Sequence, residues 1–161
     1  MPGAGCLRCR ISPKYLAAGT WHHKLQIMTF EKLLYARWGD MDFNGHMKNT
    51  AYLDASADVR MFFFEANGFS MREFDRLRIG PVITRDELEY FRELRLLEPV
   101  RVTLTAREIR DDGRFVLVNE FFRGDGQRVA RVTSNGGWLD LDKRKLTTPP
   151  EELRRLLEKL L

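Results

Sequence analysis

The chain has 161 residues, of which 43% are hydrophobic and 31% are charged. That length suits one domain with a real core, and the composition is too apolar for a disordered protein. No stretch approaches 18 consecutive apolar residues, so no membrane span is expected. The net charge of +4 does not indicate nucleic-acid binding, because residues 1–27 hold four basic side chains and no acidic one, which leaves the rest of the chain neutral.

Residues 1–27 differ from the remainder of the sequence. They contain both cysteines, Cys6 and Cys9, but a single C-x-x-C without a second pair is weak evidence for a metal or redox site. They also lack the apolar run of a secretory signal. We therefore expect residues 1–27 to be a disordered or mis-started extension and residues 28–161 to form the domain. The absence of cysteine after position 9 fits a reducing compartment, which predicts a cytoplasmic protein.

The first half of the domain predicts a strand, a polar loop and a long helix. Thr29–Arg37 is rich in aromatic and aliphatic residues and predicts the strand, and residues 38–49 are polar. Apolar residues then recur at helical spacing over Thr50–Asn67, where Gly68 provides a natural end. The run Phe62-Phe63-Phe64 makes the far end of this helix apolar nearly all round, as expected for a helix enclosed by a sheet or by a second subunit.

The second half predicts strands joined by short turns. Extended segments are expected at Val82–Leu94, Val100–Arg107, Arg114–Arg123 and Val129–Leu141. The second of these alternates apolar and polar side chains, so one of its faces should be wet. The third is apolar on both faces over F-V-L-V and should be a central strand. Gly136-Gly137 predicts a bulge or a close approach of another backbone.

The chain ends in a predicted helix over Pro149–Leu161. Thr148 and Glu151 have the spacing of a capping box, and Pro149 falls at the first helical position. One stripe of this helix consists of Leu153, Leu156, Leu157 and Leu160. Hairpin-linked strands around one apolar helix predict an α+β fold, in which a curved antiparallel five-stranded sheet wraps around the long helix and the C-terminal helix covers an edge.

Several common catalytic motifs are absent from the sequence. There is no G-x-S-x-G elbow, no P-loop and no G-x-G-x-x-G after a strand. No cysteine nucleophile exists after Cys9, and His46 is the only histidine after residue 27, so that part of one chain cannot form a multi-histidine metal site. A carboxylate-only metal site stays open, but no metal and no cofactor is expected.

One polar cluster precedes the long helix: Asp40-x-Asp42-x-x-Gly45-His46-x-x-Asn49. A helix start exposes backbone N–H groups that can hold the oxyanion formed when a carbonyl is attacked. A carboxylate nearby can act as the nucleophile or as the base that activates a water. These parts suffice for acyl-group hydrolysis. The same residue types also make ordinary caps and turns, so local chemistry alone leaves a purely structural role open.

The segment R-W-G-D-M-D-F-N-G-H-M-K-N-T-A-Y-L-D, residues 37–54, resembles the signature of the hotdog-fold acyl-CoA thioesterases of the 4-hydroxybenzoyl-CoA thioesterase type, D-x-D-x-x-G-H-x-x-N-x-x-Y. The later segments L-E-Y-F-R-E-L-R-L-L-E-P-V-R-V and W-L-D-L-D are also similar to that family. The resemblance covers about Thr29–Leu161. It implies a hotdog fold, hydrolysis of an acyl-CoA or acyl-carrier-protein thioester, and a homodimer or homotetramer whose sites are shared between two subunits.

The resemblance also implies roles for single residues. Asp42 occupies the position of the catalytic carboxylate, as nucleophile or general base, and Asp40 is structural. His46 polarises the carbonyl or places the water. Substrate or water is positioned by Gly45, Asn49 and Tyr52, although Tyr52 is equally compatible with core packing. The CoA phosphates need cations, for which the candidates are Arg85, Arg92, Arg95 and Arg107.

Two other functions stay open. Hotdog enoyl-CoA hydratases and dehydratases usually place a histidine five residues after the aspartate, whereas Asp42 and His46 are four apart. The chain could also be a non-catalytic hotdog module that binds acyl groups along its apolar helix, because fold similarity alone does not prove activity.

Overall fold

The computed structural model describes residues 29–161, so the expectation for residues 1–27 lies outside the described residues. The elements are, in chain order, β1 (Phe30–Tyr35), a 3-10 turn (Trp38–Asp40), α1 (Asn49–Ala66), α2 (Met71–Leu77), β2 (Ile79–Tyr90), β3 (Pro99–Ile109), β4 (Phe115–Arg123), β5 (Arg128–Asp140), β6 (Lys145–Thr147) and α3 (Glu151–Glu158). Within this part of the chain, no helix has the length and apolarity to cross a bilayer.

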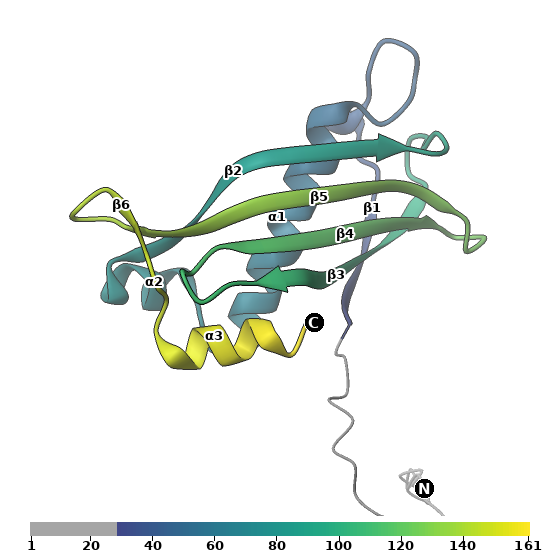
Figure 1. The fold of residues 1–161 in the computed structure, drawn as a ribbon. Coiled ribbons are helices and arrows are strands. Elements are labelled where there is room, and N and C mark those ends of the chain that lie inside the picture. Colours follow the sequence, from purple (N-terminus) through teal and green to yellow (C-terminus); the bar gives the residue numbers. More distant parts are fainter. Residues whose placement is uncertain (1–28) are drawn as a thin grey trace, which may run out of the picture.

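A single antiparallel sheet organises the molecule. Its strands follow the order β1-β3-β4-β5-β2, and the short β6 pairs with the end of β5. Figure 1 shows the sheet curving over α1, which runs behind it, with α3 beside the β3 edge. The predicted α+β architecture is confirmed, with five long strands as expected. The sixth strand, which is three residues long, was not predicted.

Packing of α1 against the concave face of the sheet forms the core. The helix buries Tyr52, Val59, Phe63 and Phe64 towards the strands. The indole ring of Trp138 on β5 lies edge-to-face against Phe64, with 5.8 Å between ring centroids. Such pairs add to the area that they bury. By contrast, Phe62 is exposed, so the apolar far end of α1 is only partly enclosed by this chain.

The helix boundaries follow local signals. α1 ends next to Gly68, whose φ of +86° lies in the left-handed region that favours glycine. The helix α2 was not predicted, although its start carries a recognisable cap. The Oγ atom of Ser70 accepts the backbone N–H of Glu73 at 3.2 Å, which is half of an S-x-x-E capping box.

The strand predictions are largely confirmed. The inward side chains of β3, at Val100, Val102, Leu104 and Ala106, are all buried, and β4 is central. The outer face of β3 is less wet than predicted, because Thr103 is buried too. β2 begins at Ile79, before Pro81, which an edge strand tolerates because a proline cannot donate to a second neighbour.

Gly136 marks a close approach between strands, as predicted. A Cβ atom there would lie 2.5 Å from the carbonyl oxygen of Val82 and 2.7 Å from the ring of Phe115. The register between β2 and β5 shifts between Ile83 and Arg85. No side chain larger than hydrogen fits at this crossing of β2, β4 and β5.

The predicted capping box of the last helix is wrong. α3 begins at Glu151, its N-cap is Pro150, and no side chain caps it. Pro149 cannot be helical because a residue that precedes a proline is forced towards extended conformations. The leucine stripe is buried as predicted. The carbonyl of Leu160 accepts the backbone N–H of Ala106 at 2.8 Å, so the C-terminal segment covers the part of the β3 edge that β1 leaves unpaired.

Candidate active site

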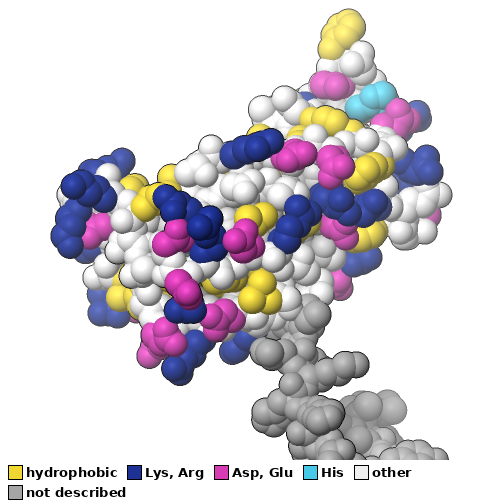
Figure 2. All heavy atoms as spheres, in the orientation of Figure 1, with side chains coloured by type: hydrophobic (Ala, Val, Ile, Leu, Met, Phe, Trp, Pro, Cys, Tyr) yellow, Lys and Arg dark blue, Asp and Glu magenta, His cyan; other side chains and the backbone are white. Residues whose placement is uncertain are grey.

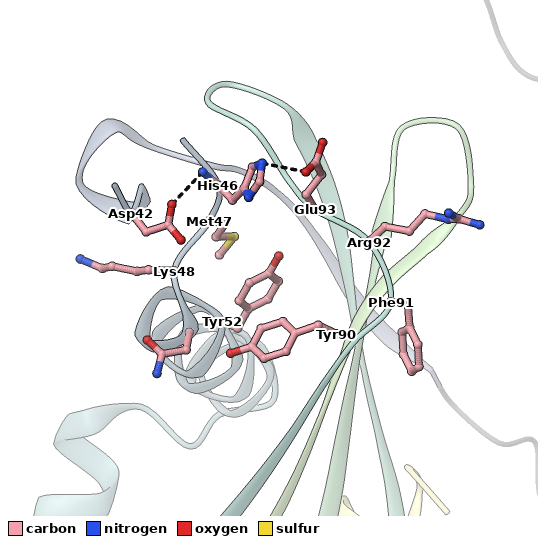
Figure 3. Close-up of a pocket in the computed structure, with 10 residues that line it drawn as sticks. Asp42, His46, Met47, Lys48, Tyr52, Tyr90, Phe91, Arg92 and Glu93 are labelled. Atoms are coloured by element: carbon pink, nitrogen blue, oxygen red, sulfur yellow. Dashed lines mark hydrogen bonds and ion pairs between the residues drawn. The ribbon is translucent and has the colours of Figure 1, made fainter. Parts of the chain in front are cut away.

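A cleft of about 540 Å³ opens at the start of α1, between the loop that precedes this helix and the end of β2 (Figure 3). It is lined by Asp42, His46, Met47, Lys48, Asn49, Tyr52, Tyr90, Phe91, Arg92 and Glu93. The cleft therefore brings together four of the five predicted site residues, all but Gly45, and adds four consecutive residues from β2 and the turn after it.

Asp40 holds the base of the loop. Its carboxylate accepts the backbone N–H of Arg37 at 2.8 Å and two guanidinium N–H groups of the same residue at 3.0 and 3.1 Å. Its carbonyl accepts the N–H of Lys48 at 2.8 Å, which closes the loop. Although burial acts to raise the pKa of Asp40, the hydrogen bonds and charge of Arg37 keep it below its ordinary value. The geometry fits the structural role that the resemblance implied.

Asp42 lies at the rim of the cleft and is exposed in this chain. Its Oδ1 atom accepts the backbone N–H groups of Asn44 at 2.8 Å and His46 at 3.0 Å. These bonds, that from His46 above all, hold the pKa of Asp42 below its ordinary value. The tight turn needs Gly45 at a φ of +75°. Oδ2 accepts no backbone N–H of residues 29–161, so it is open to water or substrate.

The first residue of α1, Asn49, lines the same cleft and carries an unused backbone donor. The N-cap of this helix, Lys48, makes no side-chain cap. The side chain of Asn49 folds back so that Oδ1 accepts the N–H of Thr50 at 2.9 Å. Among the described residues, the backbone N–H of Asn49 meets no acceptor. A helix start with such a group stabilises negative charge on a bound oxygen.

His46 and Glu93 tie the two walls of the cleft together (Figure 3). The Nε2 atom of His46 lies 2.7 Å from a carboxylate oxygen of Glu93. Glu93 also pairs with Arg95 at 2.7 Å, and its pKa is lowered first by Arg95 and then by His46. The backbone N–H of Met47 donates to the carbonyl of Leu94 at 2.8 Å, beside this pair. Sequence analysis missed Glu93, because nothing in the sequence indicates which distant carboxylate meets His46.

Tyr52 forms the floor of the cleft. Its ring packs edge-to-face against Tyr90 and Phe121, with centroid distances of 5.7 and 5.2 Å. Burial raises the pKa of Tyr52 to about 12, so the hydroxyl keeps its proton. In Figure 3 this hydroxyl points towards Met47 and the cleft. Tyr52 thus packs in the core and also faces the cleft. The sequence did not predict that Tyr90 of β2, whose ring contacts Tyr52, lines the same cleft.

Two basic residues line the cleft, Lys48 and Arg92. The Nζ atom of Lys48 donates to the carbonyl of Gly39 at 2.8 Å, and the Arg92 side chain extends outwards in Figure 3. Of the four candidate arginines, only Arg92 lines the cleft; Arg95 pairs with Glu93, and Arg85 lies 3.7 Å from Glu87. Figure 2 shows basic and acidic side chains interspersed over the outer face of the sheet rather than gathered in a patch of one sign. No group of three or more His, Cys, Asp or Glu side chains within residues 29–161 could hold a metal ion.

Several solved structures have a fold similar to that of this chain. The chain superposes on protein SAV2348 from Staphylococcus aureus, solved in complex with CoA, with a TM-score of 0.75 and 21% identity over 81% of this chain and 82% of that chain. It superposes on Slr0204, a 1,4-dihydroxy-2-naphthoyl-CoA thioesterase from Synechocystis, with a TM-score of 0.74 and 16% identity over 83% and 98%. For YbaW, a probable thioesterase from Escherichia coli, the TM-score is 0.69, with 21% identity over 81% and 98%.

At these identities the solved structures establish the fold, which confirms the predicted hotdog arrangement. The comparison with curated proteins gave no match. The sequence itself matches the family model described as the thioesterase-like superfamily over residues 36–157, a range that includes the loop, α1 and every long strand after it. The chain therefore belongs to the thioesterase-like superfamily.

Proposed function

We propose that this protein hydrolyses acyl-CoA thioesters to a free carboxylic acid and CoA in the cleft at the start of α1. One observation carries the proposal: an ionised carboxylate, Asp42, and an unused helix-start donor, the Asn49 N–H, line the same cleft. The family membership supports a thioester substrate. The CoA bound to SAV2348 and the CoA thioester named for Slr0204 support CoA as its thiol part.

The chemistry follows from these two groups. The Asn49 N–H donates a hydrogen bond to the thioester oxygen and stabilises the negative charge that this oxygen gains as the carbonyl is attacked. As a general base, Asp42 takes a proton from a water whose oxygen bonds to the carbonyl carbon. The carbon–sulfur bond then breaks, and the leaving thiolate takes the proton from Asp42. As a nucleophile, Asp42 would instead bond to the carbonyl carbon and displace the CoA thiolate, and water would then hydrolyse the resulting anhydride and supply the proton that the thiolate takes.

The neighbouring residues position the reactants. Glu93 orients the imidazole of His46 at the mouth, where it can polarise the carbonyl or place the water. Gly45 permits the tight turn that holds Asp42 beside the cleft, and Tyr52 lies beneath the bound thioester. Lys48 and Arg92 are the cations of the cleft that could contact the CoA phosphates.

The test is Asp42→Asn, assayed by thiol release from a panel of acyl-CoAs. Asparagine keeps the oxygen that accepts the N–H groups of Asn44 and His46, so the loop should stay folded. We expect kcat to fall by about a hundredfold or more. Asp54→Asn, which removes an exposed carboxylate from α1, is the control and should leave turnover unchanged.

Near-normal turnover in Asp42→Asn would reject Asp42 as the catalyst. Adding enoyl-CoA esters to the panel separates hydrolysis from hydration, because hydration consumes the double bond and releases no thiol. If the protein binds CoA esters but hydrolyses none of them, it is a non-catalytic binding module.

A further inference from the structure

A second cavity lies between the middle of α1 and the strands β2 and β4, with a volume of about 230 Å³. Its walls are apolar and include Met61, Phe64, Ile83, Phe115 and Leu117. One charged side chain, Arg60, also lines it. A cavity of this composition would suit an alkyl chain, and the single guanidinium adds a specific polar contact to it.

Arg60 is mostly buried and has few partners. Its Nη1 atom donates to the Oγ atom of Ser134 at 2.8 Å, and that hydroxyl donates to a carboxylate oxygen of Asp86 at 2.6 Å. Over the described range, Ser134 is the one acceptor that the guanidinium contacts, although it carries five N–H groups. Burial lowers the pKa of Arg60, and Asp86 only partly offsets this effect.

A buried cation with one neutral contact is costly unless a further acceptor completes its hydrogen bonds. The planar guanidinium matches a carboxylate, because two parallel N–H groups can bind both carboxylate oxygens. The chemistry of the cavity therefore fits a ligand that is apolar along its length and anionic at its end.

The cavity and the cleft lie along the same pair of elements. The cleft is lined by Tyr52 of α1 and Tyr90 of β2, and the cavity by Arg60 of α1 and Ile83 of β2. Tyr52 and Arg60 are eight residues apart, which is about 12 Å along a helix axis. A thioester at the start of α1 and a group at Arg60 would therefore be separated by a distance that an acyl chain of medium length can span.

We propose that Arg60 binds a carboxylate at the far end of the acyl group, so that the protein prefers CoA monothioesters of dicarboxylic acids to methyl-ended acyl-CoAs of equal length. This inference rests on the proposed function. Arg60 would act as a specificity residue, and Ser134 and Asp86 would hold its guanidinium in place. The carboxylate would neutralise the positive charge of the Arg60 guanidinium, which the apolar walls of the cavity do not compensate.

The experiment compares acyl-CoAs in pairs, one ending in a methyl group and one in a carboxylate, over lengths from about six to about twelve carbons. We expect kcat/KM of the unmodified protein to favour the carboxylate member by about tenfold or more at the best length. Arg60→Met should abolish this preference and leave turnover of methyl-ended substrates intact. Arg60→Lys should keep part of it, and Arg72→Met, which removes an exposed arginine from α2, should keep all of it.

Binding measurements separate this inference from the proposed function. Calorimetry with CoA thioethers, which cannot be hydrolysed, compares a carboxyalkyl with an alkyl group on sulfur. A carboxylate preference that Arg60→Met removes supports the site even if no ester is hydrolysed. Equal affinity for both thioethers in the unmodified protein overturns the site even if hydrolysis is fast. If Arg60→Met fails to fold, the affinities of the unmodified protein for the two thioethers still show whether it prefers the carboxylate.

Discussion

Asp40 and Asp42 are two residues apart and have different surroundings. Asp40 is buried, and both of its carboxylate oxygens are engaged by Arg37. Asp42 is exposed, and the backbone N–H groups of its own loop donate to only one of its oxygens. A carboxylate that reacts must be both fixed and accessible, and Asp42 alone combines these properties. The first aspartate therefore fixes the shape of the loop, and the second has a carboxylate oxygen that is open to a reactant, as the proposed function requires.

The pH dependence of the reaction tests this division. Because N–H donors lower the pKa of Asp42 below its ordinary value, its ionised form is lost only as the pH falls through that lowered pKa. We expect the Asp42-dependent limb of a kcat/KM profile to lie on the acid side of the ordinary aspartate pKa, with no loss from this group near neutral pH. A loss between about pH 5 and pH 7 that persists in His46→Gln would contradict the assignment.

At the scale of elements, the crossing of β2, β4 and β5 depends on the absence of one side chain. Gly136→Ala places a Cβ atom 2.5 Å from the Val82 carbonyl oxygen, which is backbone and cannot rotate away. We expect the free energy of unfolding to fall by about 1–3 kcal/mol in urea titrations. In the control, Gly124→Ala, the new Cβ atom meets Pro99 at 3.4 Å, so the change should stay within about 0.5 kcal/mol. Equal stability of the two variants would show that the strands can separate at Gly136.

Long elements were predictable because their patterns repeat. α1 and the strands β3, β4 and β5 were found within a few residues of their ends, and the leucine stripe of α3 lies inside as expected. Short elements lack a repeat: β6 has three residues and α2 has seven. The start of α3 was misplaced because two competing signals, a capping box and a proline pair, overlap at Thr148–Glu151.

The same distinction holds for the site. Asp42, His46 and Asn49 are close in the sequence, in one loop and the first residue of the helix after it, so the sequence could predict that they lie together. Tyr90 and Glu93 come from the other wall, and their meeting with this loop depends on sheet register and on the path of the turn after β2. Arg60 has the spacing of an ordinary helix position, and only the packing of α1 against β2 and β5 shows that it faces a cavity.

At the scale of the whole molecule, apolar side chains remain exposed where the sheet and the cleft end. On β1, which is an edge strand, Leu33 and Tyr35 are more than half exposed. Phe43 is fully exposed at the tip of the loop that carries Asp42, and Trp38 at its base is 81% exposed. Apolar groups grouped around a site favour contact with another protein surface. A second copy of the chain is the partner that the family resemblance implies.

We expect the protein to form a homodimer or a homotetramer in solution, with Phe43 at the contact that completes the cleft. Light scattering should then give a mass of at least twice 18.9 kDa. Phe43→Ser should weaken assembly and lower kcat/KM about tenfold or more, because burying an aromatic anchor dominates such contacts. Met71→Ser, which changes an exposed apolar side chain on α2, serves as the control and should alter neither. A fully active monomer would show that one chain completes the cleft by itself, and the shared-site prediction would then be wrong.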